Sequence, residues 1–225
     1  MADTAQAAVL WTGGKDSALA LHRVLREGLS VRRLVTFGPA KADFLAHPLE
    51  VMAQQALAVS LPHQVIQIDE PYFESYRAAI ARLRDEGIGV LVTGDIAEVE
   101  GQPNWVRQCC DGLDVQVLTP LWHADRLAVM RELLDGGFEV ILSCVKPPGF
   151  TAQWLGRTID EATLAEMQKL SATTGLDLCG ENGEYHSLAL NSPEFRRRVA
   201  IQSQPAQRGS LWHLRIRSVS LDPER

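Results

Sequence analysis

The sequence predicts an α/β protein built on a doubly wound parallel sheet, followed by a smaller C-terminal α+β domain. Over the first two-thirds of the chain, short continuous apolar runs alternate with segments of helical periodicity, a pattern typical of parallel strands covered by helices on both faces. Glycines end several of the helical segments. The alternation changes where Pro147-Pro148-Gly149 interrupts the chain. We therefore expect one domain at residues 1–140 and a second at 141–225, with a boundary near 135–147.

Each strand of the predicted sheet is a short apolar run. The runs expected to form strands are residues 7–11, 31–37, 64–68, 88–93, 115–118 and 138–145. Helical spacing of apolar residues predicts helices at residues 16–27, 48–59, 71–86, 104–110, 124–134 and 160–174. Near the C-terminus, residues 212–216 alternate between apolar and polar and predict a closing strand, whose phase Val219 breaks. We interpret Arg196-Arg197-Arg198 as a solvated helix end.

Composition and charge exclude several classes of protein. Hydrophobic residues make up 46% and charged residues 22% of the 225 residues, as in globular rather than disordered chains. The formal net charge of −6 argues against a dedicated nucleic-acid-binding protein, which is usually basic. No apolar run approaches the ~20 residues that span a bilayer, and residues 1–8 lack the basic residues that open a secretory signal. The four cysteines form no C-x-x-C pair, so we expect a cytoplasmic protein with free thiols and no membrane partner.

The sharpest local feature is Thr12-Gly13-Gly14-Lys15-Asp16-Ser17, between the first predicted strand and the first predicted helix. Two glycines let a ligand approach the backbone closely, and the N–H groups that open a helix point toward an anion. Lys15 in the first helical turn opposes the helix dipole by about 0.3–1 kcal/mol, a penalty that a bound phosphate would remove. A plain strand–helix turn capped by Asp16 or Ser17 is the alternative. The loop is not a Walker A motif, because Val9 stands at the first glycine position.

A second feature, Gly94-Asp95, directly follows the predicted strand at 88–93. Ligands of open parallel sheets bind outside the carboxyl ends of the strands. Asp95 is therefore a candidate to hold Mg²⁺ or to contact a nucleotide, and Asp16 is a second candidate ligand of Mg²⁺. An ordinary Gly-Asp turn is the alternative.

A third feature is the run Cys179-Gly180-Glu181-Asn182-Gly183-Glu184-Tyr185-His186. Two carboxylates, an imidazole and two glycines fall within eight residues. Glu181 and Glu184 are candidates to orient ammonia, to act as a base or to share a metal ion. Taken alone, a run of this composition is typical of a solvated turn.

These residues resemble a known family. The loop at 12–17 is similar to the S-G-G-x-D-S signature of the PP-loop, or N-type, ATP pyrophosphatases, with Thr12 in place of serine. Five segments in order are similar to the diphthine–ammonia ligase family, also described as the ATP-binding diphthamide-synthase domain: residues 13–17, 94–95, 120–122, 155–160 and 179–186. The resemblance covers nearly the whole chain. It implies a Rossmann-like (HUP-type) ATP-binding domain with strand order 3-2-1-4-5 and a C-terminal substrate-binding domain.

The resemblance also implies an activity. The characterised members of the diphthine–ammonia ligase family use ATP and Mg²⁺ to activate the carboxylate of diphthine, a modified histidine of elongation factor 2, as an acyl-adenylate. Ammonia then displaces AMP to form an amide. The resemblance implies catalytic roles for Lys15, Asp16, Glu181 and Glu184. It implies ATP binding by Thr12, Gly13, Gly14, Lys15, Asp16, Ser17, Gly94 and Asp95. The acceptor side would comprise Gly180, Glu181, Asn182, Gly183, Glu184, Tyr185 and His186. Asn182 stands where many members have glycine, and Ser187 where threonine is commoner, so the identity of the acceptor stays open.

Other functions also stay open. A PP-loop enzyme of this kind would equally adenylate a different small carboxylate or amide, and a nucleotide-binding relative without catalysis is a third possibility. A transfer-RNA thiolase is disfavoured, because the C-x-x-C pair is absent and the net charge is negative. The expected partners are a carboxylate acceptor and ammonium, and a homodimer is an open question.

Overall fold

A computed structural model describes residues 6–41, 43–98 and 104–223. The chain divides into two compact units. The first unit comprises Met1–Thr12, Asp16–Asp43 and Leu61–His123, and the second comprises Gly13–Lys15, Phe44–Ser60 and Ala124–Arg225. Each unit contains its own sheet.

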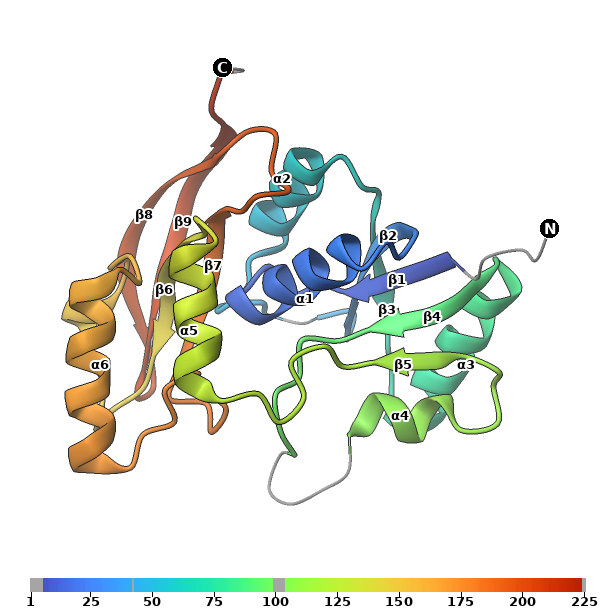
Figure 1. Cartoon of the computed structure of the whole chain (residues 1–225), viewed down its shortest axis with the longest axis horizontal. Coiled ribbons are helices and arrows are strands. Elements are labelled where there is room, and N and C mark those ends of the chain that lie inside the picture. The colour runs from blue at the N-terminus through green and yellow to red at the C-terminus, as the bar shows by residue number, and fades with distance from the viewer. Residues whose placement is uncertain (1–5, 42, 99–103, 224–225) are drawn as a thin grey trace. The chain divides into compact units, whose positions relative to one another are not determined.

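The sheet of the first unit is parallel, with the strand order β3-β2-β1-β4-β5 (Figure 1). Its strands are β1 (Gln6–Leu10), β2 (Val31–Gly38), β3 (His63–Gln67), β4 (Ile88–Val92) and β5 (Gln116–Leu118). Every neighbouring pair is parallel. The central strand buries Ala7, Ala8 and Val9 completely, as expected of an apolar run covered on both faces. The predicted fold class and strand order are confirmed.

Helices cover both faces of this sheet. Figure 1 shows α1 (Lys15–Arg26) on one face, and α3 (Tyr72–Asp85) and α4 (Trp105–Cys110) on the other. Right-handed crossovers explain this division, because the chain runs from β1 through β2 to β3 in one direction and returns to β4 and β5 in the other. Ile80, Leu83 and Val106 pack with the strands in one hydrophobic cluster.

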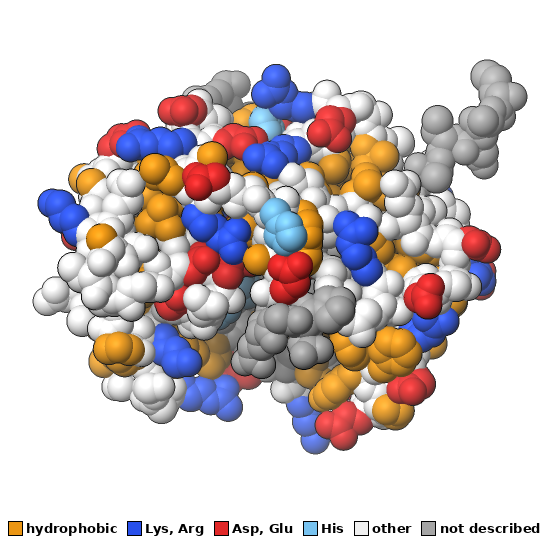
Figure 2. All heavy atoms as spheres, turned by 60° about the horizontal axis from the view of Figure 1, so that its bottom comes forward, with side chains coloured by type: hydrophobic (Ala, Val, Ile, Leu, Met, Phe, Trp, Pro, Cys, Tyr) orange, Lys and Arg blue, Asp and Glu red, His pale blue; other side chains and the backbone are white. Residues whose placement is uncertain are grey.

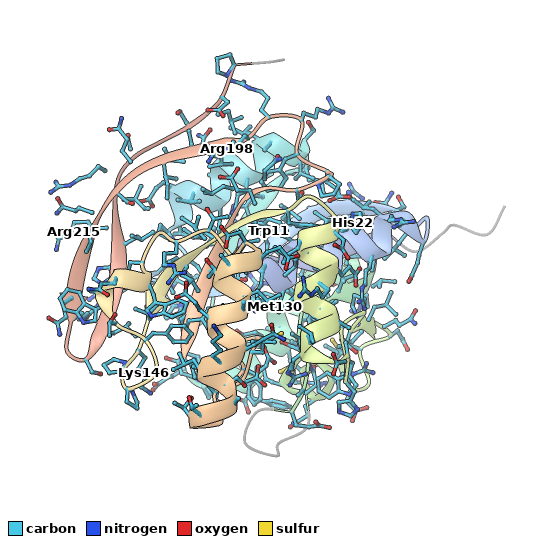
Figure 3. The ribbon with its side chains drawn as sticks, turned by 60° about the vertical axis from the view of Figure 1, so that its left-hand side comes forward. Trp11, His22, Met130, Lys146, Arg198 and Arg215 are labelled. Atoms are coloured by element: carbon cyan, nitrogen blue, oxygen red, sulfur yellow. The ribbon has the colours of Figure 1, made fainter. Side chains whose placement is uncertain are left out.

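The sheet of the second unit is antiparallel, with the order β7-β6-β9-β8. Its strands are β6 (Glu139–Val145), β7 (Tyr185–Asn191), β8 (Val199–Arg208) and β9 (Leu211–Leu221), and its helices are α2 (Leu49–Val59), α5 (Arg126–Asp135), α6 (Glu161–Thr174) and the short 3-10 helix η1 (Ala152–Trp154). Helix α2 packs against β8 and β9. Helices α5 and α6 run side by side (Figures 1 and 3), joined by an ion pair between Arg131 and Glu161.

Three features of the second unit differ from the sequence-based expectation. Strands β7 and β8 are formed by residues whose sequence shows no clear strand periodicity. Strand β8 contains Pro205 and lies at an edge of the sheet, where a proline is tolerated best. Strand β9 continues past Val219 because its pairing with β8 shifts between Gln202 and Ser203. This bulge explains the broken alternation.

The prediction that Arg196, Arg197 and Arg198 lie at the end of a helix is wrong. These residues lead into β8 without forming a helix. Arg197 donates to the carbonyl oxygens of Leu221 and Asp222, and Arg198 forms an ion pair with Glu139. Figure 3 shows Arg198 at the end of the sheet opposite Lys146. The arginines therefore join the first and last strands of the unit instead of capping a helix.

All four cysteines are free and buried, which confirms the expected free thiols. Burial raises the pKa of Cys109, Cys110 and Cys144 to about 11 in each case. Among the described residues, none of the helices is long and apolar enough to cross a membrane. On the face shown in Figure 2, acidic and basic side chains are interspersed with hydrophobic ones.

The raised pKa values predict slow alkylation of the native protein. Only the thiolate reacts with iodoacetamide, so modification of Cys109, Cys110 and Cys144 at pH 8 should be at least ~10-fold slower than in the urea-unfolded chain, and should accelerate as the pH rises toward 11. Peptide mass spectrometry after timed quenching measures each site. Equal rates in the native and unfolded protein at pH 8 would contradict the burial of these thiols.

Candidate functional site

In the first unit, Gly94, two residues after the end of β4, lies against the start of α1. A Cβ atom on Gly94 would lie 2.6 Å from the carbonyl carbon of Asp16 and 2.8 Å from the amide nitrogen of Ser17. Glycine is therefore required by close backbone contact. The Thr12 hydroxyl donates to the Ser17 hydroxyl across the turn, at 3.3 Å. The sequence-predicted loop and the Gly94 corner are thus neighbours at the point where the strand order reverses.

Asp95 is held by a small network. Its Oδ2 accepts from the Thr93 hydroxyl at 2.6 Å and from Asn104 Nδ2 at 2.5 Å. Asn104 Oδ1 in turn accepts from Arg107 N at 3.0 Å and caps α4. The carboxylate is therefore oriented by groups that sequence patterns did not single out. The sequence pattern predicts Asn104 only as the first residue of a helix.

In the second unit, the backbone of the glycine loop is bonded to β7. The Gly13 carbonyl oxygen accepts from Ala189 N at 2.9 Å and from the Gln55 amide at 2.9 Å. The same amide nitrogen donates to the Ala189 carbonyl at 2.8 Å. Gln55 is fully buried. A Cβ on Gly13, whose φ is +73°, would lie 2.2 Å from Gln55 Oε1, so glycine is required by both conformation and space.

The next two residues of the loop, Gly14 and Lys15, also lie against strand β7. Lys15 N donates to the Ser187 hydroxyl at 3.1 Å. A Cβ on Gly14 would lie 3.2 Å from the Ser187 carbonyl oxygen and 3.3 Å from His47 Cε1. His47 also meets His186 edge to face, with ring centroids 5.2 Å apart. His47 therefore belongs to the surroundings of the loop, although its sequence context gave no indication of this.

The side chain of Lys15 is almost completely buried, with 2% exposed. Its ammonium donates to the Cys179 carbonyl at 2.5 Å and lies 5.2 Å from the centre of the Tyr185 ring. The Tyr185 hydroxyl donates to the Leu178 carbonyl at 2.9 Å, which fixes the ring. A carbonyl dipole and an aromatic face both stabilise a cation. Both groups that contact the buried Lys15 amine are therefore ones that favour a cation.

Carboxylates brace the loop that precedes β7. Glu184 accepts from Asp177 N at 2.8 Å through Oε1 and from Asn182 N at 3.0 Å through Oε2. Asp177 accepts from Cys179 N at 2.7 Å and from Arg126 Nε at 3.0 Å. Gly180 cannot carry a side chain, since its Cβ would lie 2.9 Å from the Tyr185 carbonyl oxygen. Both oxygens of Glu184 thus hold the shape of residues 177–184.

The structure brings two sequence-predicted motifs together. Lys15 of the glycine loop contacts Cys179 and Tyr185 of the run at residues 179–186, although more than 160 residues separate Lys15 from that run. Among the described residues, no group of three or more histidine, cysteine, aspartate or glutamate side chains is arranged to hold a metal ion.

The fold and the loop define a Rossmann-like α/β protein with a glycine-rich turn between its first strand and first helix. Two family models match the chain: the diphthamide synthase N-terminal domain over residues 5–117 and the diphthamide synthase C-terminal domain over residues 125–220. The chain therefore belongs to the diphthamide synthase family.

Curated relatives agree over most of the chain. The diphthine–ammonia ligase of Danio rerio is 26% identical, over 86% of this chain and 85% of its own length. The human diphthine–ammonia ligase is 24% identical, over 87% of this chain and 82% of its own. The protein of the same name from Schizosaccharomyces pombe is 27% identical over 95% of this chain, which matches only 39% of that longer protein.

Removing the Gln55 amide should destabilise the second unit. In Gln55→Leu the buried carbonyl of Ala189 loses its bond from this side chain, and Gly13 loses one of two. We expect a loss of about 1–3 kcal/mol in the free energy of unfolding. Gln54→Leu, one position earlier on α2, is the matched control and should change stability little. Urea unfolding measures both variants, and equal stabilities would contradict the role of Gln55.

Proposed function

We propose that this protein is an ATP-dependent ligase that transfers AMP to a carboxylate and forms an amide when ammonia displaces the AMP. Family membership supports the general activity. The contact of Lys15 with the 179–185 segment carries the proposal furthest. This contact connects the loop proposed to bind phosphate, at residues 12–17, with the run proposed to bind the acceptor, at residues 179–186.

The position of the loop at the start of α1 supports phosphate binding, because the N–H groups that open a helix favour an anion. The structure requires glycine at position 13 and leaves little room for a side chain at position 14, and the buried Lys15 would supply a positive charge. Thr12, Gly13, Gly14, Lys15, Asp16, Ser17, Gly94 and Asp95 would surround the phosphates. ATP would supply the adenylyl group that turns a carboxylate oxygen into part of a good leaving group. This chemistry requires charge neutralisation and alignment more than a protein nucleophile, in keeping with the buried thiols.

Mg²⁺ would be held by Asp16 and Asp95. Mg²⁺ usually keeps several waters and binds one or two carboxylates together with substrate phosphates. Two protein carboxylates are therefore enough. The hydrogen bonds from Thr93 and Asn104 would keep Asp95 oriented.

The acceptor side would be formed by residues 180–186, with Gly180, Asn182, Gly183, Tyr185 and His186 shaping it. Glu181 would orient ammonium and accept its proton, while Glu184 would hold the segment in shape. The acceptor would be diphthine on elongation factor 2, as the names of the relatives suggest, or another small carboxylate. About three-quarters of the aligned residues differ from those of the Danio rerio relative, so both kinds of acceptor should be tested.

Lys15→Ala should abolish adenylation. Pyrophosphate release from Mg·ATP with ammonium is measured across a panel of carboxylates that includes diphthine-bearing elongation factor 2. Loss of a fixed charge from the phosphate site should lower the rate by at least ~100-fold. Lys169→Ala, a surface lysine on α6, is the control and should keep full activity.

The products decide between the open alternatives. AMP and pyrophosphate that require one acceptor identify the substrate and establish the ligase. ADP and phosphate instead of AMP would exclude the proposed mechanism. Tight ATP binding without cleavage for any acceptor would favour the nucleotide-binding relative.

Two glutamate variants separate chemistry from support. Glu184→Gln retains one acceptor oxygen and should lower the melting temperature, because its two bonds to Asp177 N and Asn182 N hold the loop. Glu181→Gln should reduce turnover and shift the pH profile for ammonium use. Calorimetry and steady-state rates measure these effects. An unaltered turnover in Glu181→Gln would exclude it as the proton acceptor.

A further inference from the structure

A cavity of about 280 Å³ in the second unit is lined by three consecutive arginines, at positions 196–198. Asn191 at the end of β7, Phe195, and Asp222 just after β9 also contribute to its lining. The cavity therefore lies where the segment between β7 and β8 meets the end of β9. None of these residues belongs to the glycine loop or to residues 179–186, and the proposed ligase mechanism uses none of them.

The three arginines differ in how their charges are balanced. Among the described residues, Arg198 is the only one of the three that forms ion pairs. Its guanidinium holds Glu139 through Nε and Nη2, and its Nη1 lies 3.8 Å from Asp222 Oδ2. Arg197 donates instead to two backbone carbonyl oxygens, at 2.6 and 3.1 Å, which orient the guanidinium without cancelling its charge. Two of the three arginines thus bring a positive charge that no described carboxylate pairs with.

The backbone that carries Arg196 is fixed before any ligand binds. The Ser192 hydroxyl accepts from Glu194 N at 3.3 Å and donates to Glu194 Oε2 at 3.2 Å. Phe195 N donates to the Ser192 carbonyl at 3.0 Å, and the Phe195 side chain is buried. Arg196 N donates to the carbonyl of Ala58 on α2 at 2.8 Å, while the Arg196 side chain is exposed. Because the backbone is already ordered, a ligand would have to order only the end of this side chain.

The sequence concentrates positive charge in this part of the chain. Residues 195–221 contain six arginines and no aspartate or glutamate, although the formal net charge of the whole chain is −6. Adjacent like charges repel one another, and an anion placed between them relieves that repulsion. A guanidinium also presents its N–H donors in a planar fork that matches the oxygens of a carboxylate or a phosphate. The cavity is therefore suited to an anion, and two unpaired guanidinium groups favour one with more than a single negative charge.

We propose that this cavity binds a phosphoryl group, as the free ion or as a monoester, through Arg196 and Arg197. A phosphate monoester carries a charge of about −1.5 to −2 at pH 7 and three acceptor oxygens, whereas a carboxylate carries one charge and two oxygens. The volume of about 280 Å³ is just below the range of pockets for drug-sized ligands. The cavity thus admits the phosphoryl group and a few further atoms.

Backbone amide NMR of the whole protein, without ATP, tests the cavity directly. The probes are inorganic phosphate, O-phosphoserine and acetate, with sodium chloride keeping the ionic strength constant. Phosphate should shift the amide signals of residues 191–198 saturably and bind at least ~10-fold more tightly than acetate, because it places two charges on the guanidinium groups instead of one.

Matched arginine variants locate the binding site. Arg196→Gln should weaken phosphate binding at least ~10-fold, as expected for the loss of one charge-assisted hydrogen bond, and should fold normally because this side chain is exposed. Arg215→Gln removes the same charge from an exposed position of β9, opposite Gln204 and apart from Arg198 (Figure 3). The affinity of this control for phosphate should change little.

Each outcome is decisive for the cavity. O-Phosphoserine that binds at least as tightly as phosphate would identify a phosphoryl group carried by another molecule, and weaker binding would identify the free ion. Equal binding of acetate and phosphate would overturn the proposal, as would the absence of saturable shifts. Equal losses in the two arginine variants would show only a diffuse attraction to basic residues, and shifts confined to residues 12–17 would place the anion at the glycine loop. Because neither ATP nor an acceptor is present, the result does not depend on the ligase proposal.

Discussion

The hydrogen bonds between the backbone of Gly13–Lys15 and strand β7 are the interaction on which the candidate site depends. The Gly13 carbonyl bonds to Ala189 N and to Gln55, and Lys15 N bonds to Ser187. A loop with two glycines has many accessible conformations, and fixing it costs conformational entropy. Because its backbone is tied to a strand and to a fully buried glutamine, that cost is met in the folded state, before any ligand binds. The loop is therefore preorganised.

A buried charge follows from the same arrangement. Lys15 opens α1, where the helix dipole disfavours a cation, and its side chain is almost fully buried. The Cys179 carbonyl and the Tyr185 ring compensate in part. Their positions depend in turn on the Asp177 and Glu184 carboxylates, which accept bonds from the surrounding backbone. Acidic residues far from Lys15 in the chain thus determine where its charge is held.

Membership of the diphthamide synthase family and the local geometry answer different questions. The family accounts for both halves of the chain and for the proposed AMP-forming chemistry. The local geometry shows instead which side chains hold the glycine loop in place, namely Gln55 and Ser187.

Several features were determined by the sequence itself. Apolar runs and their spacing predicted the parallel sheet, because strands buried on both faces must be continuously apolar. The glycine loop was evident from its composition, and Gly94-Asp95 from its place directly after a predicted strand. The contact with Asp16 and Ser17 that requires glycine at position 94 is tertiary. Only the tertiary structure decided what these motifs touch. Gln55 and His47 contact residues that are distant in the chain, and Asn104 contacts Asp95 across the β4–α4 connection. No local sequence pattern encodes such partners. Strand β8 and the pairing of the arginines were likewise decided by neighbouring strands, since an exposed edge carries no hydrophobic alternation.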